Sequence, residues 1–196
     1  MNPLEDMFNL ASRHKNFKQP LLNKVKAQDI RLVQNLATPE ARQLYKLHRQ
    51  VGRETHLKTG FMRFESSPNG ILFGKTRLEH NTLDLILNHF TQRFPIFHIA
   101  IQLNGKTFVQ GPKIKKTFNF ELGATIKHLE LMLPVNPILS ELNFEENNIW
   151  EKFYDSQYIG QRRNLRLQRQ MMPFKYRDSI FETAKSKRSN DLRSYF

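Results

Sequence analysis

The densest group of cationic side chains lies in the last fifth of the sequence. Between Gln161 and Arg177 there are six lysines and arginines and no carboxylate. On a helix of 3.6 residues per turn, most of these arginines project within about one-sixth of the circumference. Guanidinium groups bind phosphate oxygens, often through two parallel hydrogen bonds. The segment therefore predicts a phosphate-binding helix through Arg162, Arg163, Arg166 and Arg169; the alternative is a solvated helix face whose arginines pair with the protein's own carboxylates.

A second set of cations is expected on a helix nearer to the N-terminal end. Thr38-Pro39-Glu40 is typical of a helix start, with a hydroxyl for the cap, proline in the first turn and an early carboxylate. The helix is expected to run to about Lys58 and to stop at Gly60. Its apolar face consists of Leu44, Leu47, Val51 and Thr55. Its cations follow at offsets of 4, 7 and 11 residues and so share one face, the cationic stripe of Arg42, Lys46, Arg49 and Arg53.

Residues that could support catalysis carry no recognisable motif. The chain has seven histidines, but no His-Glu-x-x-His, no phosphate loop, no dinucleotide-binding glycine pattern and no nucleophile elbow. Glu54 and His56 are two residues apart, so on a helix they point in different directions. A metal site built from His56, His80 and Glu54 has no support from their spacing. We therefore expect no metal ion and no cofactor, and interpret the histidines as structural.

Composition narrows the class of protein. Lysine and arginine number 31 against 18 carboxylates among 196 residues, a net charge of +13, and such a field attracts polyanions. The alternative is a protein that merely tolerates a basic surface. No cysteine is present, which excludes disulfides, thiolate catalysis and cysteine-ligated metals. No apolar run is long enough to span a membrane and no secretory signal is recognisable, so we expect a cytoplasmic location and no membrane partner.

Secondary-structure signals divide the rest of the chain into short elements. Two strands are expected at 61–65 and 71–78, joined by a turn of serine, proline, asparagine and glycine. A helix follows to Pro95. Asn104-Gly105 predicts a hairpin between strands 96–103 and 106–110. After an exposed basic loop at Gly111–Lys116, helical signal resumes at 122–132 and again from about Glu145.

These elements predict an α+β fold. We expect a small, mainly antiparallel sheet with helices packed on it, followed by a basic C-terminal helix. Residues 1–27 are interpreted as a loosely packed basic arm that holds a short helix. Residues 28–181 are expected to form a single domain, and residues 182–196 a polar flexible tail.

Three blocks of the sequence resemble a bacterial family known as domain of unknown function 4130. The first, Val51–Phe64, is similar to the pattern Val-x-Arg-Glu-x-His-x-x-x-Gly-Phe-x-Arg-Phe. The second is Leu78-Glu79-His80-Asn81, followed by His89–Phe94. The third comprises Trp150 and Tyr154 leading into Arg162–Pro173. The resemblance covers residues 40 to 180; the Tyr-Asp-Gly segment with which the family usually opens is not matched.

The resemblance implies an association with DNA metabolism. Family members resemble partners of a DNA repair or modification protein of the radical S-adenosylmethionine (radical SAM) class, and some similar domains are fused to a uracil-DNA glycosylase-like domain. The family carries no assigned reaction, so the matching residues transfer as a signature. Those that could surround a catalytic pocket are Glu54, His56, Arg63, His80, His89 and Asn164.

Three hypotheses follow from the sequence. The leading one is an accessory protein of DNA metabolism, without strong catalytic activity, that binds nucleic acid through the cationic stripe and the C-terminal arginines. The second is an enzyme or enzyme subunit whose pocket is built from the six signature residues. The third is an adaptor whose arginine helix docks on a radical SAM enzyme. Convergence of the six residues favours the enzyme; exposed cations gathered on one face favour nucleic-acid binding.

Overall fold

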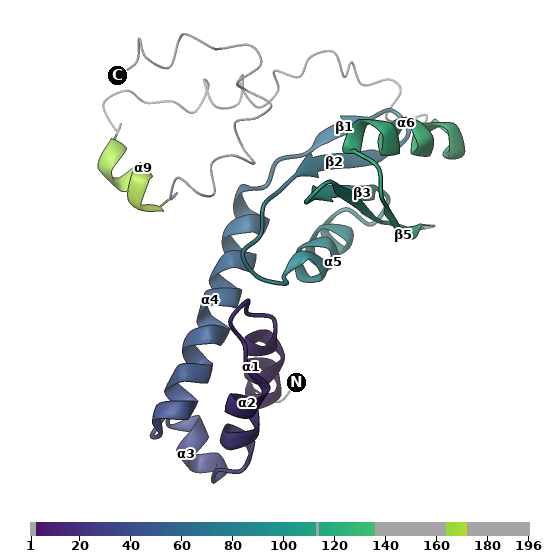
Figure 1. Ribbon diagram of the computed structural model, residues 1–196. Helices are drawn as coiled ribbons and strands as arrows, with labels where there is room; N and C mark the ends of the chain where they lie inside the picture. Colours follow the sequence, from purple (N-terminus) through teal and green to yellow (C-terminus); the bar gives the residue numbers. More distant parts are fainter. Residues whose placement is uncertain (1–2, 113, 136–163, 172–196) are drawn as a thin grey trace. The chain divides into compact units, whose positions relative to one another are not determined.

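The chain folds into helices followed by a small sheet in the computed structural model, which describes residues 3–112, 114–135 and 164–171 (Figure 1). These residues divide into two units. The helical unit comprises the described residues up to Gly60 together with Leu78–His89, and the sheet unit comprises Phe61–Arg77 together with the described residues from Phe90 onward. This arrangement confirms the predicted α+β class. Among the described helices, none has both the length and the apolar character that crossing a membrane requires.

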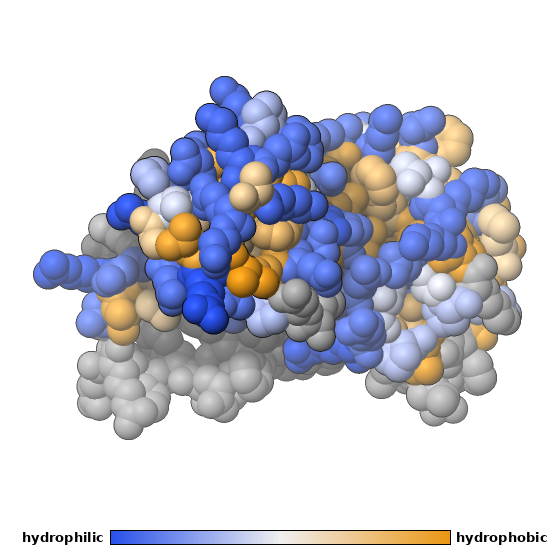
Figure 2. Space-filling model, turned by 90° about the horizontal axis from the view of Figure 1, so that it is seen from below, coloured by the Kyte–Doolittle hydropathy of each residue, from blue (hydrophilic) through white to orange (hydrophobic). Residues whose placement is uncertain are grey.

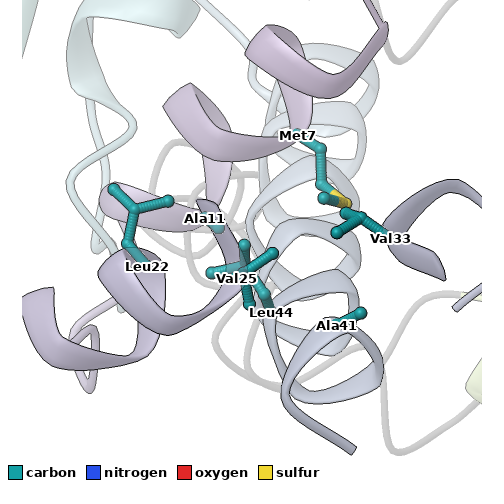
Figure 3. Close-up of a cluster of buried hydrophobic side chains, with 7 residues drawn as sticks. All are labelled: Met7, Ala11, Leu22, Val25, Val33, Ala41 and Leu44. Carbon is teal, nitrogen blue, oxygen red and sulfur yellow. The ribbon is translucent and has the colours of Figure 1, made fainter. Parts of the chain in front are cut away.

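The helical unit has its own hydrophobic core. It contains helices α1 (Pro3–Ser12), α2 (Gln19–Lys26), α3 (Ile30–Gln34), most of α4 (Pro39–Phe61) and the first part of α5 (Leu83–Arg93). Apolar side chains from the first four helices point toward one another (Figure 3). The buried cluster consists of Met7, Ala11, Leu22, Val25, Val33, Ala41 and Leu44.

This core changes the interpretation of the N-terminal segment. Residues 3–26 are not the loosely packed arm that we expected, because α1 and α2 bury Met7, Ala11, Leu22 and Val25. The helices have ten and eight residues. Helices this short are marginal alone in water, so packing on neighbouring helices is what stabilises them. The predicted limits of the main domain and of the tail extend into residues outside the described part and stay predictions.

Helix α4 begins where the sequence predicts. The Thr38 hydroxyl accepts a hydrogen bond from the Ala41 N–H at 3.2 Å, which makes Thr38 the N-cap. The helix ends one residue beyond Gly60, because a glycine permits the left-handed conformation that stops a helix but does not impose it. Of the predicted apolar face, Leu44 and Val51 are buried, while Leu47 and Thr55 are half-buried.

The sheet unit is built on five strands in the order β1-β2-β3-β4-β5. They are β1 (Glu65–Ser67), β2 (Ile71–Lys75), β3 (His98–Leu103), β4 (Lys106–Gln110) and β5 (Lys115–Phe118). All neighbours pair antiparallel except β2 and β3, whose connection contains α5. Helix α6 (Leu122–Met132) contributes Leu122, Ile126 and Leu129 to the core of this unit.

The predicted hairpin is confirmed in its register and in its turn. Asn104 and Gly105 adopt φ angles of +51° and +77°, as a two-residue turn of this type requires. Helix α6 has the predicted limits, and helix α5 ends two residues before Pro95.

Four predictions about the sheet were wrong in detail. Strand β2 ends at Lys75 instead of residue 78, and β3 begins at His98 instead of residue 96. The first strand is Glu65–Ser67 instead of 61–65, because α4 includes Phe61. The expected basic loop contains the start of β5, in which Lys115 and Lys116 are exposed and only Phe118 is buried. Lysines are common on an edge strand because they oppose pairing with another chain, so their charge is compatible with a strand as well as a loop.

Near the C-terminal end, helix α9 (Leu165–Met171) covers seven residues of the expected basic helix, and the remainder lies outside the described residues.

Candidate functional site

The side chain of Glu54 is buried in the helical unit and bound by three donors. It is 2% exposed. Its Oε1 accepts a hydrogen bond from the Glu79 N–H at 2.6 Å, and Oε2 accepts from the His80 N–H at 3.1 Å and from the Thr82 hydroxyl at 3.0 Å. Hydrogen bonds to an ionised group are stronger than neutral ones. The carboxylate therefore fixes residues 79–82, the loop that leads into α5, against the side of α4.

The same loop is tied to the connection between α1 and α2. The Asn81 N–H donates to the Arg13 carbonyl oxygen at 2.9 Å, and the Arg13 guanidinium donates to the Asn81 carbonyl oxygen at 3.3 Å. Arg13 also forms an ion pair with Asp84, in the first turn of α5. A weaker pair joins Lys15 to Glu79 at 3.8 Å. Three segments that are distant in the sequence are thus held together around Glu54.

Two histidines pack against each other in this network. The rings of His14 and His80 lie 4.2 Å apart between centroids, tilted by 31°. The Asn16 N–H donates to His14 Nδ1 at 3.0 Å, so a neutral His14 carries its proton on Nε2 and donates it to Gln50 Oε1, 2.7 Å away. The Lys15 N–H approaches His80 Nδ1 at 3.4 Å. Both rings are therefore oriented through Nδ1 by backbone donors.

The surroundings of His80 favour the uncharged form of its ring. Burial disfavours the imidazolium and lowers the pKa of His80 from its ordinary value of 6.5. Glu54 and Glu79 oppose this lowering of the pKa, whereas His14 and Lys15 add to it. A neutral His80 suits a position where a second imidazole lies in direct contact.

The chemistry open to Glu54 is limited by its burial. A general base must lie within hydrogen-bond reach of the proton that it removes. The side chain of Glu54 has almost no contact with solvent, and its two carboxylate oxygens accept hydrogen bonds from three donors of the protein itself. Glu54 is therefore best explained as the residue that positions the loop carrying His80.

The six candidate catalytic residues do not gather in the described part of either unit. Within the helical unit, Glu54 and His80 come together through the hydrogen bond from the His80 N–H. His56 is exposed on α4 and His89 is exposed on α5. Arg63 and Asn164 belong to the sheet unit. Burial lowers the pKa of Arg63. At the start of α9, Asn164 Oδ1 accepts a hydrogen bond from the Leu167 N–H at 2.9 Å. Among the described residues no cluster of three or more histidines and carboxylates could hold a metal ion.

The cationic stripe lies on the exposed face of α4. Arg42, Lys46, Arg49 and Arg53 are all exposed, because the opposite face of the helix faces the core. The two carboxylates of α4 do not compete with them, since Glu54 is buried and Glu40 is half-buried. None of the four cations forms an ion pair with another described residue. With a rise of 1.5 Å per residue, the stripe is about 17 Å long. Figure 2 shows that hydrophilic residues cover much of the face seen from below, with smaller apolar areas among them.

The C-terminal arginines are described only in part. Arg166 is exposed on α9, and Arg169 belongs to the same helix. Arg162 and Arg163 lie outside the described residues. Their shared helix face therefore stays a prediction, and the cationic stripe of α4 is the set of cations whose arrangement is established.

Sequence reasoning missed three residues of this region. His14 falls in the segment that we interpreted as a loose arm, and its contact with His80 joins residues that no local pattern relates. Gln50 orients His14 but resembles any polar helix residue. Tyr45 is 36% exposed beside the cationic stripe. A signal for Tyr45 was present, because it follows Arg42 by three residues and precedes Arg49 by four, the spacing of one helix face.

Comparison with known proteins places the chain in a family. No curated protein and no solved structure matches it. Residues 14–182 match a family described as a domain of unknown function, DUF4130. The match covers most of the chain, including α4, the 79–82 loop and the five strands. The protein therefore belongs to the domain of unknown function 4130 family.

Proposed function

We propose that the protein is an accessory protein of DNA repair or modification that binds nucleic acid through the cationic stripe of α4. The observation that carries the proposal is the placement of Arg42, Lys46, Arg49 and Arg53 on one exposed helix face that has no exposed carboxylate. The arginines of the C-terminal segment extend the binding surface in this proposal. A role in DNA metabolism rests on the family resemblance of the sequence blocks, and a cytoplasmic location is part of the same proposal.

The dimensions of the stripe support a contact with several phosphates. Four cations spread along about 17 Å of helix can each meet a different phosphate of a nucleic-acid backbone. Binding that neutralises four phosphates gives a slope of log K against log salt of about −3.6 on duplex DNA and about −2.8 on a single strand. Participation of the C-terminal arginines makes both slopes steeper. Contacts of this kind position the protein without reading a base sequence.

The packing of the helical unit supports a stable presentation of these cations. Ala41, Leu44 and Val51 are completely buried on the side of α4 opposite to the stripe, and Glu54 holds the 79–82 loop against the same helix. Rotation of α4 about its axis would expose these residues. The cations therefore face outward before any ligand binds, so that binding does not have to order the helix.

A salt-titrated binding assay tests the proposal. Wild-type protein and the Arg49→Ala/Arg53→Ala variant are titrated with single-stranded and duplex DNA at several salt concentrations. The variant should bind both DNAs more weakly, with the slope reduced by about 1.4 on the single strand and about 1.8 on the duplex. A matched control is Lys106→Ala/Lys115→Ala, which removes the same charge from exposed positions of β4 and β5. Equal weakening by both variants, or a flat response to salt in the wild type, contradicts the proposal.

A protein partner is a second candidate, favoured by exposed apolar side chains on α3. Ile30 is 57% exposed and Leu32 is 45% exposed. They are two residues apart and so point in different directions on the helix, and each offers a separate exposed apolar position for a protein contact. The family resemblance suggests a radical SAM enzyme as the partner. Co-purification of such an enzyme that persists after nuclease treatment, and is lost in an Ile30→Glu/Leu32→Glu variant, supports this candidate.

A further inference from the structure

The cationic stripe is flanked on one side by two exposed ring side chains. By the 3.6-residue period, Tyr45 lies about 60° and His56 about 40° from Arg42 around the axis of α4, in the same direction. They are eleven residues apart, which is about 17 Å along the helix. His56 is exposed and Tyr45 is 36% exposed. The ring of Tyr45 rests on that of His48, with 5.6 Å between centroids and 28° between planes.

The contact with His48 gives Tyr45 a defined orientation. Stacking on one side limits the rotamers of the phenol ring, while more than a third of the side chain remains open to solvent. An ordered aromatic ring beside a row of cations is the combination that binds unpaired nucleic acid, in which cations follow the backbone and bases stack on the ring. In a duplex the faces of the bases are covered by their neighbours, so the ring has no comparable contact.

We infer that the cationic stripe and Tyr45 together bind an unpaired DNA strand, with the cations on consecutive phosphates and a base stacked on Tyr45. This inference rests on the proposed function, because it specifies which form of DNA the stripe prefers. The charge complementarity of the stripe with a phosphate backbone selects a nucleic acid over an apolar peptide. The position of Tyr45 then selects an unpaired strand over a duplex.

Substitution of Tyr45 separates the contribution of base stacking from that of the phosphate contacts. Loss of one base–aromatic stack weakens binding by roughly 5- to 150-fold. Tyr45→Ala should therefore weaken binding of single-stranded DNA by this factor, leave binding of a duplex of the same sequence unchanged, and leave the salt slope unchanged. Tyr45→Phe keeps the ring and should bind like the wild type. A fluorescent base analogue in the strand should be quenched on binding the wild type and Tyr45→Phe, and not on binding Tyr45→Ala.

The outcomes distinguish this inference from the proposal beneath it. Normal single-strand binding by Tyr45→Ala, or equal losses on both forms of DNA, overturns the stacking role. If Arg49→Ala/Arg53→Ala still weakens binding in that case, the proposed function stands and only the preference for an unpaired strand is lost. If the arginine variant has no effect, the proposed function itself fails. A circular dichroism melt of each variant ensures that the comparison concerns folded protein.

Discussion

Removal of the Glu54 carboxylate should loosen the helical unit at one identified place. Three donors bind this carboxylate, the Glu79 N–H, the His80 N–H and the Thr82 hydroxyl. A hydrogen bond to a charged group contributes about 1.5–3 kcal/mol. After truncation the two loop amides can bind water that enters the space, so the cost is less than the sum of three such bonds. We expect Glu54→Ala to lower the free energy of unfolding by about 2–4 kcal/mol.

Glu54→Gln tests the same contacts with almost no change in volume. The amide retains one acceptor oxygen and turns its NH₂ group toward at least one of the three donors, so we expect a loss of about 1–3 kcal/mol. Thr82→Val removes a single donor and should cost about 1–2 kcal/mol. Because these two residues are in contact, the double variant should lose less stability than the two single variants together. The exposed Glu65 of β1 provides the matched control, Glu65→Gln.

Two measurements are needed, because the chain contains two units. Urea unfolding followed by far-ultraviolet circular dichroism reports the free energy of unfolding of the helices. Hydrogen exchange reports the Glu79 and His80 amides directly, and their protection should fall in Glu54→Gln but not in Glu65→Gln. If both amides keep their protection and Glu54→Gln is as stable as Glu65→Gln, the carboxylate does not hold the loop. A functional role for Glu54 would then become the better explanation.

Two further predictions concern the same unit. Because burial lowers the pKa of His80, the unfolded chain binds this proton more tightly. The contribution of His80 to stability is therefore complete above pH 6.5 and is lost as the pH falls through the lowered folded-state value. His80→Gln should flatten the decline in melting temperature between about pH 6.5 and 5, and an unchanged decline contradicts this. Leu44 is 0% exposed in the core of the helical unit, whereas Leu131 is 88% exposed. Leu44→Ala should therefore lower the free energy of unfolding by about 2–5 kcal/mol, and Leu131→Ala by less than about 0.5 kcal/mol. Similar losses for the two variants in urea unfolding would contradict the assignment of Leu44 to the core.

Local patterns predicted the elements whose signals lie within a few residues. The cap at Thr38, the period of the apolar residues in α5 and the Asn104-Gly105 turn each act through neighbours in the sequence. The packing of α1 and α2 could not be read in this way, because these helices have only ten and eight residues and their apolar residues become buried against one another and against α3 and α4. The end of α4 was misplaced because a glycine permits two outcomes and tertiary contacts choose between them.

The candidate site depends on contacts across long separations, and these have no local signature. Glu54 meets Glu79, His80 and Thr82 at separations of 25 to 28 residues, and His14 meets His80 from the other end of the unit. Resemblance to the family marked Glu54 and His80 as signature residues without giving their role. The structure supplies a physical reason, because the first block of the signature holds the second in place.

The burial of residues in the first signature block separates those that the fold requires from those that it does not. Within the first block, Val51 and Glu54 are buried and have clear roles in packing and in loop attachment. Arg53 and His56 belong to that block as well, but both are exposed on the opposite side of α4. Packing does not explain side chains that point to solvent, and exposed cations are where a ligand contact is expected. The function of this helix is therefore to be sought on its outer face, where the cationic stripe and Tyr45 lie.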